Sequence, residues 1–204
     1  MSMKTLVIED MNNVDKWVKK TGTGTIQLSS EAGRTFLRAN GYVWYEYKEN
    51  IPFDPKRLYR IRAQVRQAKD PSAGKQKAIW IGVAGIASDG NTYINVNGAN
   101  RFSSQHYFAA ASDVLPVGTW QEFTGYFKGH GTPAGGKHPD PEAPGTMYPD
   151  VSYIRPLFIL NYPDGDGIAD IDYVILEEEK AFPWAWVAGL AAAGTALYFI
   201  ARKR

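Results

Sequence analysis

The stretch Tyr59-Arg60-Ile61-Arg62-Ala63-Gln64-Val65-Arg66 decides the fold class of this chain. Apolar side chains occupy every second position, and arginine or glutamine stands between them. Successive side chains of a β-strand point to opposite faces, so a period of two predicts a strand that buries one face and wets the other. Such one-sided burial is typical of an antiparallel sheet.

Short segments of the same character recur along the chain. Turn-forming residues separate them, as at residues 39–41, 54–55 and 164–167. The main helical candidate among them is a short turn at residues 14–19. Many short strands between Gly and Pro turns predict an all-β, two-sheet antiparallel β-sandwich. The further predicted strands are residues 4–8, 25–28, 35–38, 43–48, 78–87, 92–95, 120–129, 153–161 and 169–176.

The composition narrows the function classes. The chain has 204 residues with 23 basic and 21 acidic side chains, and three of the basic ones are Arg202, Lys203 and Arg204. The rest is close to neutral, so we expect no general attraction to nucleic acid and assign any such contact to the basic tail. Because the chain has no cysteine, disulfide bonds, cysteine zinc sites and thiol catalysis are excluded.

The stretch from Phe182 to Ala201 carries no charged side chain. A helix of about twenty residues spans the roughly 30 Å hydrocarbon core of a bilayer, and aromatic residues at both ends are typical of the headgroup level. We therefore predict a sandwich domain over residues 1–179, followed by one C-terminal transmembrane α-helix with a basic tail over residues 180–204. The alternatives are a buried core helix and an apolar tail that docks on a neighbouring subunit. The residues assigned to the anchor are Trp184, Trp186, Gly189, Ala193, Tyr198, Arg202, Lys203 and Arg204.

Ala185, Gly189 and Ala193 are spaced four apart within that stretch. Small residues at this spacing share one helix face and let a second helix approach closely. This face predicts a homo-oligomer. An alanine-rich composition alone would produce the same spacing.

Three longer stretches, Glu46–Gln67, Tyr107–Gly129 and Tyr153–Glu178, show a family resemblance. The first has a Phe-Asp-Pro turn before a strand, the second a Leu-Pro-Val-Gly-Thr-Trp strand entry, and the third a closing pair of strands. In these features the chain resembles carbohydrate-binding-module-like, galactose-binding-like jelly-roll domains, in particular those of bacteriophage tail and virion structural proteins. The resemblance covers roughly residues 4–178 and implies a jelly-roll sandwich.

Aromatic residues cluster in the predicted strand at residues 43–48. Alternation places Trp44 with Tyr42 on one face and Tyr45 with Tyr47 on the other, so we expect one pair to be partly exposed. Exposed aromatic rings are the platform on which modules of this resemblance stack sugars. Trp44, Tyr45 and Tyr47 are therefore the candidate glycan-binding residues; the alternative is that the rings only stabilise the sheet.

The resemblance also implies a structural Ca²⁺ where the N-terminal segment meets the last strand. Glu9, Asp10 and Asp172 are the candidate ligands there, with carbonyls from the turn at residues 31–34 completing the six to eight oxygens that calcium prefers. Residues 164–167 resemble the start of an EF-hand loop, but the required glutamate at its far end is missing.

Candidate catalytic residues are scarce. His106, His130 and His138 have no motif around them. The segment His138–Glu142 combines a histidine with carboxylates, but it lies in the Gly- and Pro-rich stretch at residues 129–149, which offers little to hold catalytic groups in place. We interpret that stretch as an arm that contacts a neighbouring protein, and the chain as non-enzymatic.

A folded body joined to one anchor favours a non-enzymatic structural protein of a membrane-containing phage. The β-sandwich would bridge an internal virion membrane to the shell, with the lipid bilayer and capsid or other virion proteins as partners. The apolar run Leu6-Val7-Ile8 is too short for a signal-peptide core, so this segment does not direct export. From the bridging role we expect localisation on the virion, with the protein anchored in the host membrane during assembly. Two alternatives stay open: a glycan-binding surface or receptor-recognition module, and a phage tail or fibre component whose apolar end is buried in protein.

Overall fold

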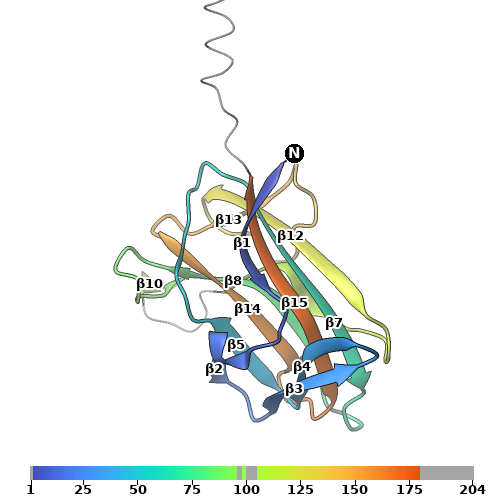
Figure 1. Ribbon diagram of the computed structural model, residues 1–204. Coiled ribbons are helices and arrows are strands. Elements are labelled where there is room, and N and C mark those ends of the chain that lie inside the picture. The colour runs from blue at the N-terminus through green and yellow to red at the C-terminus, as the bar shows by residue number, and fades with distance from the viewer. Residues whose placement is uncertain (1, 96–97, 100–104, 180–204) are drawn as a thin grey trace, which may run out of the picture.

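The computed structural model describes residues 2–95, 98–99 and 105–179, which form two stacked β-sheets and a separate two-stranded sheet at residues 94–95 and 98–99 (Figure 1). A single 3-10 turn, η1 (Val14–Lys16), interrupts the strands of this part of the chain. The strands are β1 (Met3–Glu9), β2 (Trp17–Thr21), β3 (Thr25–Glu31), β4 (Arg34–Asn40), β5 (Val43–Tyr47), β6 (Ile51–Pro52), β7 (Tyr59–Lys69), β8 (Ala78–Ile86), β9 (Ile94–Asn95), β10 (Gly98–Ala99), β11 (Gln105–Asp113), β12 (Gln121–His130), β13 (Gly145–Met147), β14 (Tyr153–Tyr162) and β15 (Ile168–Glu179).

The seven-stranded sheet has the order β13-β12-β7-β15-β4-β3, and β1 also pairs with β15. The long strand β15 has β7 along one edge, while β4 and then β1 share its other edge. The described strands of this sheet pair antiparallel, except that β13 runs parallel to β12. This arrangement places the β3–β4 hairpin beside the first half of β15, at the lower end of the sandwich in Figure 1.

The six-stranded sheet has the order β11-β8-β14-β5-β2, and the short strand β6 also pairs with β14. Its pairings are all antiparallel among the described strands. The strands β5, β14 and β8 are central, so their side chains on the inner face meet the other sheet, and those on the outer face form a surface of their own. The all-β, two-sheet sandwich predicted from the alternation is confirmed.

The main core lies between the two sheets. In β7 the side chains of Tyr59, Ile61, Ala63 and Val65 are fully buried, as the period of two predicts. They meet residues such as Phe158 on β14 in one continuous cluster. Fully burying a large apolar side chain contributes about 1.5–3 kcal/mol, so this interleaved layer is the main source of stability.

Five strands were not predicted from the sequence: the short strands β6, β10 and β13, and the longer strands β2 and β11. Residues 17–19 were expected within a helical turn, but the turn ends at Lys16 and β2 begins at Trp17, whose indole is buried in the core. The strand β11 contains the run Ala109-Ala110-Ala111, and alanine has low strand propensity. It forms because β8 offers a partner edge, and its pairing with β8 is irregular in two places.

Within the described residues, no helix is both long enough and apolar enough to cross a membrane. The predicted transmembrane helix at residues 180–204, with Trp184, Trp186, Gly189, Ala193, Tyr198, Arg202, Lys203 and Arg204, lies outside the described residues. The anchor and the small-residue helix face therefore stay predictions from the sequence.

Candidate functional site

The outer face of the six-stranded sheet carries an apolar cluster that is separate from the main core. Trp44 on β5, Ile159 on β14 and Trp80 on β8 lie directly opposite one another across these strands and so share one face. Ala84 and Leu157 complete the cluster with Trp44 and Ile159, and Trp80 packs against it. An apolar outer face is unusual on a sheet of this kind, which normally presents polar residues to water.

Four aromatic rings form a continuous row over this cluster, which we call the aromatic row (Tyr42, Trp80, Tyr107 and Tyr162). The ring of Trp80 lies 4.4 Å from that of Tyr107 and 5.9 Å from that of Tyr162, centroid to centroid. Tyr162 in turn meets Tyr42 edge-on at 5.6 Å. The four residues come from β8, β11, the end of β14 and the β4–β5 turn, so the row crosses the strands.

The aromatic row is accessible along much of its length. Tyr162 is 38% exposed, and the other three rings are partly exposed. Burial raises the pKa of Tyr42 and, more strongly, of Tyr107, so both hydroxyls stay protonated near neutral pH. Among the described residues, the indole N–H of Trp80 is buried and has no hydrogen-bond partner. A ligand acceptor beside Trp80 would satisfy this donor.

A second group of residues, the polar cluster (Lys20, Glu46, Tyr93 and Arg155), lies next to the aromatic row. The hydroxyl of Tyr93 donates to Oε2 of Glu46 at 2.6 Å, and Nζ of Lys20 donates to the same hydroxyl at 2.6 Å. Glu46 is only 1% exposed, and burial raises its pKa against the opposing effects of Tyr93, Lys20 and Arg155. Its Oε1 is buried and finds no partner in the described part of the chain, so it is a second group that a ligand could satisfy.

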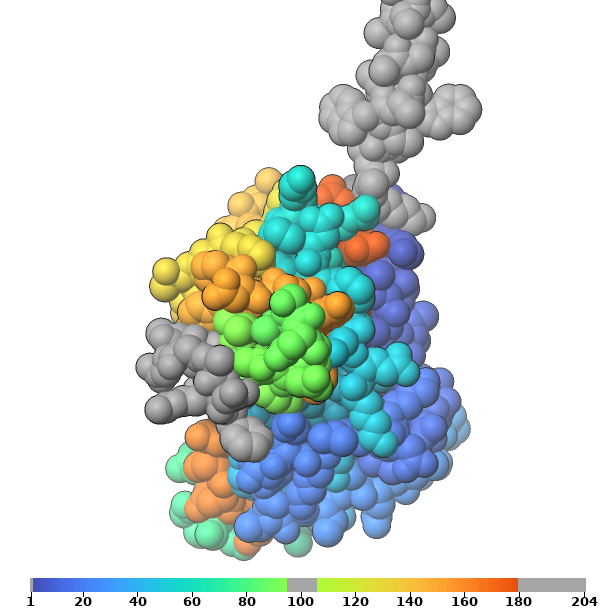
Figure 2. Space-filling view, turned by 90° about the vertical axis from the view of Figure 1, so that its left-hand side faces the viewer, coloured from blue at the N-terminus to red at the C-terminus, as the bar shows by residue number. Residues whose placement is uncertain are grey.

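The β8–β9 turn holds Tyr93 in place over the sheet. The carboxylate of Asp89 accepts hydrogen bonds from the backbone of Asn91 and from the backbone and hydroxyl of Thr92, which close the turn. The side chains of Asn50 and Arg155 donate to the carbonyl of Gly90. Figure 2 shows this green turn lying against the cyan residues that follow β5. These hydrogen bonds hold the turn, and with it Tyr93 of the polar cluster, against the sheet.

The aromatic residues predicted to bind glycans lie on opposite faces of β5. Tyr45 and Tyr47 point into the core, where Tyr45 stacks on Phe158 and Tyr47 meets Trp17 edge-on. Trp44 lies on the outer face, and all three are at most 8% exposed. A platform made of these three residues is therefore not formed, because β5 is a central strand covered on both faces. Of that segment, Trp44 supports the aromatic row from below.

The aromatic row itself was missed at the sequence level. A signal for it exists in β8, where Trp80 stands at the position of the alternation that should face water. Tyr107 and Tyr162 gave no such signal, because β11 was not predicted and Tyr162 lies at the very end of β14. Their convergence depends on how β8, β11 and β14 pair.

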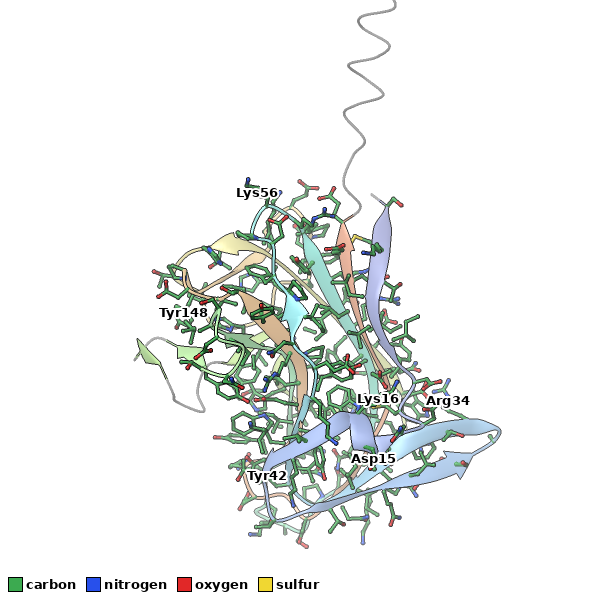
Figure 3. The ribbon with its side chains drawn as sticks, turned by 60° about the vertical axis from the view of Figure 1, so that its left-hand side comes forward. Asp15, Lys16, Arg34, Tyr42, Lys56 and Tyr148 are labelled. Carbon is green, nitrogen blue, oxygen red and sulfur yellow. The ribbon has the colours of Figure 1, made fainter. Side chains whose placement is uncertain are left out.

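Two of the three carboxylates predicted to hold calcium have cation partners. The buried carboxylate of Glu9 accepts from Nζ of Lys16 at 3.0 Å, and Asp172 lies 3.6 Å from Nε of Arg34. Asp10 is exposed. No group of three acidic or other metal-ligating side chains gathers in the described residues, and the calcium site at Glu9, Asp10 and Asp172 stays a prediction from the sequence. Two cations, Lys16 and Arg34, supply the positive charge there (Figure 3).

Two stretches noted in the sequence, residues 164–167 and 129–149, form hydrogen bonds with other parts of the same chain. The carboxylates of Asp164 and Asp166 accept hydrogen bonds from the backbone of Gln76 and Ser72, so they tie two loops together. In the stretch at residues 129–149, the backbone of His138 bonds to Phe108 and Tyr126. At His138 this stretch therefore packs on β11 and β12, and its predicted contact with a neighbouring protein stays a prediction.

Among the comparisons with known proteins, the solved structures support the fold. No family model matches the chain, and no curated protein matches its sequence. The CBM22-1 xylan-binding domain of Xyn10C from Paenibacillus barcinonensis is similar in structure, with a TM-score of 0.52, 12% identity, and coverage of 88% of this chain and 97% of that one. The CBM22-1-GH10 modules of Clostridium thermocellum endo-1,4-beta-D-xylanase 10B, complexed with xylohexaose, give a TM-score of 0.55 and 12% identity over 87% of this chain. The chain spans 29% of that second structure. The expected jelly-roll likeness to carbohydrate-binding modules is confirmed at the level of fold.

Proposed function

We propose that this chain is a non-catalytic carbohydrate-binding module that holds a neutral glycan along the aromatic row. The observation that carries the proposal is the pairing of that row with two buried, unpartnered polar groups, the indole N–H of Trp80 and Oε1 of Glu46. Sugar rings present apolar C–H faces that pack on aromatic rings, and their hydroxyls both donate and accept hydrogen bonds. A hydroxyl that accepts from Trp80 and another that donates to Glu46 would satisfy both groups.

The size of the row favours an oligosaccharide over a single sugar. Trp80, Tyr107 and Tyr162 belong to the three neighbouring strands β8, β11 and β14. Neighbouring strands lie about 4.8 Å apart, so rings on three of them extend over about 10 Å, and Tyr42 lengthens the row. A glycan lying across the strands would contact several rings at once.

The same surface is poorly suited to glycoside hydrolysis. Glycosidases generally use two carboxyl groups that face each other about 5–9.5 Å apart. The aromatic row and the polar cluster together contain one carboxylate, Glu46, and its Oε2 is engaged by Tyr93. This composition supports binding without catalysis.

The experiment is isothermal titration of the chain with neutral oligosaccharides, starting with xylohexaose and extending to β-linked glucose, mannose and galactose hexamers. Trp80→Ala and Tyr162→Ala should each weaken binding about tenfold, because each removes one stacking ring. Tyr126→Ala is the matched control, since this partly exposed tyrosine lies on β12 in the other sheet. Equal losses in all three variants, or no binding by any of the hexamers, would overturn the proposal.

A second proposal, at the level of localisation, rests on the uncharged stretch from Phe182 to Ala201. We propose that it ties the sandwich to a lipid bilayer, in the setting of a membrane-containing virion where capsid proteins are the neighbours. Liposome flotation of the full chain and of a form ending at Glu179 tests this proposal. Flotation of the full chain alone supports the anchor, whereas sedimentation of both forms supports an apolar end buried in protein.

A further inference from the structure

A pocket lies on the opposite side of the sandwich from the aromatic row, on the outer face of the seven-stranded sheet. It is an open pocket of about 300 Å³ at the β3–β4 hairpin, where Figure 3 labels Arg34 on the side away from Tyr42. Small-molecule sites occupy roughly 300–1,000 Å³, so this pocket suits a ligand of one or two rings. Its lining residues are Glu31, Ala32, Arg34, Phe36, Arg66 and Trp120.

Two aromatic rings form the apolar part of the pocket. Phe36 on β4 is buried, and Trp120, just before β12, is partly exposed and meets it edge-on with centroids 5.5 Å apart. The guanidinium carbons of Arg66 and Arg34 lie 4.7 Å and 4.9 Å from the centroid of the Trp120 ring. A ligand on Trp120 would therefore meet two cations.

The charges beneath the pocket do not cancel without Glu31. The buried carboxylate of Asp170 accepts from Nε of Arg38 at 2.8 Å and from Nη2 of Arg66 at 2.6 Å. Two guanidinium groups sharing one carboxylate leave one positive charge in excess. Glu31 supplies the balancing charge, with its Oε2 2.5 Å from Nη2 of Arg66.

Glu31 is a weakly held partner. Its side chain is 57% exposed at the hairpin tip, where ion pairs are screened by water and salt. The side chain of Arg34 is 41% exposed; its Nε lies 3.6 Å from Asp172, and its Nη1 donates to Oε1 of Gln64 at 3.2 Å. Arg66 by contrast is fixed by Asp170. The pocket thus combines one fixed cation with an anion that a ligand could displace.

We propose that this pocket binds an acidic sugar, a ring of pyranose size that carries a carboxylate, such as a uronic acid residue. The ligand carboxylate takes the place of Glu31 on Arg66 and reaches Arg34, while the sugar ring packs against Trp120. A planar carboxylate matches the paired N–H groups of a guanidinium better than a neutral hydroxyl does. This site is independent of the aromatic row, which lies on the other sheet.

The test is isothermal titration of the full chain with a galacturonic acid trisaccharide and with the matching neutral galactose trisaccharide. Trp120→Ala should weaken binding of the acidic trisaccharide about tenfold, since it removes the stacking ring. Glu31→Gln should strengthen it about two- to fivefold, because the competing carboxylate is lost. Glu142→Gln is the matched control: it removes one negative charge from an exposed position far along the chain and should change nothing.

Three results would overturn the inference. They are no binding of the acidic trisaccharide, unchanged binding in Trp120→Ala, and an equal gain in Glu31→Gln and Glu142→Gln, which would reflect net charge alone. Trp80→Ala separates this site from the aromatic row: it should leave acidic sugar binding unchanged, and a loss there would assign the ligand to the row instead. If Trp120→Ala proves unstable on heating, the exposed Glu31 variant still decides the question.

Discussion

The substitution Asp170→Asn tests whether the buried ion-pair group holds the seven-stranded sheet together. Asp170 is fully buried on β15 and is bound by Arg38 on β4 and Arg66 on β7, so one carboxylate links three neighbouring strands. Asparagine keeps the size of the side chain but removes the charge that both guanidinium groups need. Breaking a fully buried pair costs about 3–5 kcal/mol. Because Arg38 is 29% exposed and Arg66 11% exposed, we place the loss near 2–3 kcal/mol, below that range.

The assay is equilibrium urea unfolding with a parallel thermal scan. For a domain of this size, each kcal/mol shifts Tm by about 2–4 °C, so Asp170→Asn should lower Tm by roughly 4–12 °C. Glu31→Gln removes an exposed partner of the same Arg66 and should cost at most about 1 kcal/mol. Adding Arg38→Met to Asp170→Asn should restore part of the loss, because one unpaired cation is removed. Equal, small losses for Asp170→Asn and Glu31→Gln would refute the reasoning, since they would mean that water solvates Asp170.

Three further substitutions probe the site and its pH dependence. Burial raises the pKa of Glu46 above its unfolded value, so the stability it contributes is complete below about pH 4 and is lost as the pH rises through the folded pKa. Glu46→Gln should therefore gain stability relative to the wild type as the pH rises above about 4, and a constant difference in urea titrations would contradict this. The hydroxyl and backbone of Thr92 lower the pKa of Asp89 to about 2. The stability that Asp89 contributes to the fold is therefore present above about pH 4 and is lost as the pH falls towards 2. Asp89→Asn should make the free energy of unfolding less dependent on pH between about pH 4 and 2. A Cβ at Gly82 would lie 1.7 Å from the carbonyl oxygen of His106, so Gly82→Ala should lower the free energy of unfolding by about 1–3 kcal/mol. It should also weaken glycan binding, because β11 and its Tyr107 must move. Unchanged unfolding curves would contradict this, since they would mean that β11 moves away at no cost.

The fold was predictable because the inner faces of the long strands obey a strict period of two. In β7 that period runs from Tyr59 to Val65 and decides which side chains reach the core. In β14 both faces are apolar, because Leu157 and Ile159 form the outer cluster. The edge strands were harder: β2 begins with a core tryptophan but continues Val-Lys-Lys-Thr, a sequence with no clear alternation. Edge strands need to satisfy only one neighbour, so their sequences carry a weaker signal.

The candidate sites were less predictable, because they depend on which strands become neighbours. Alternation correctly separated Trp44 from Tyr45 and Tyr47, but it could not say that both faces of β5 are covered. Similarly, the sequence did not show that Lys16, in the turn η1, pairs with Glu9, or that the pairing of β4 with β15 brings Arg34 to Asp172. Cation partners far apart in sequence cannot be assigned without the register of the sheet.

The measurement that tests the central claim most directly is an NMR titration of the tryptophan indole N–H signals with xylohexaose and the other neutral hexamers. Trp80→Phe assigns the Trp80 signal, and the core residue Trp17 serves as the internal control. The account predicts that at least one hexamer shifts the Trp80 signal in a saturable manner, because its N–H gains an acceptor, while the Trp17 signal stays in place. Binding of a neutral hexamer that leaves the Trp80 signal unmoved, or no shift with any hexamer, would contradict a glycan-binding role for the aromatic row.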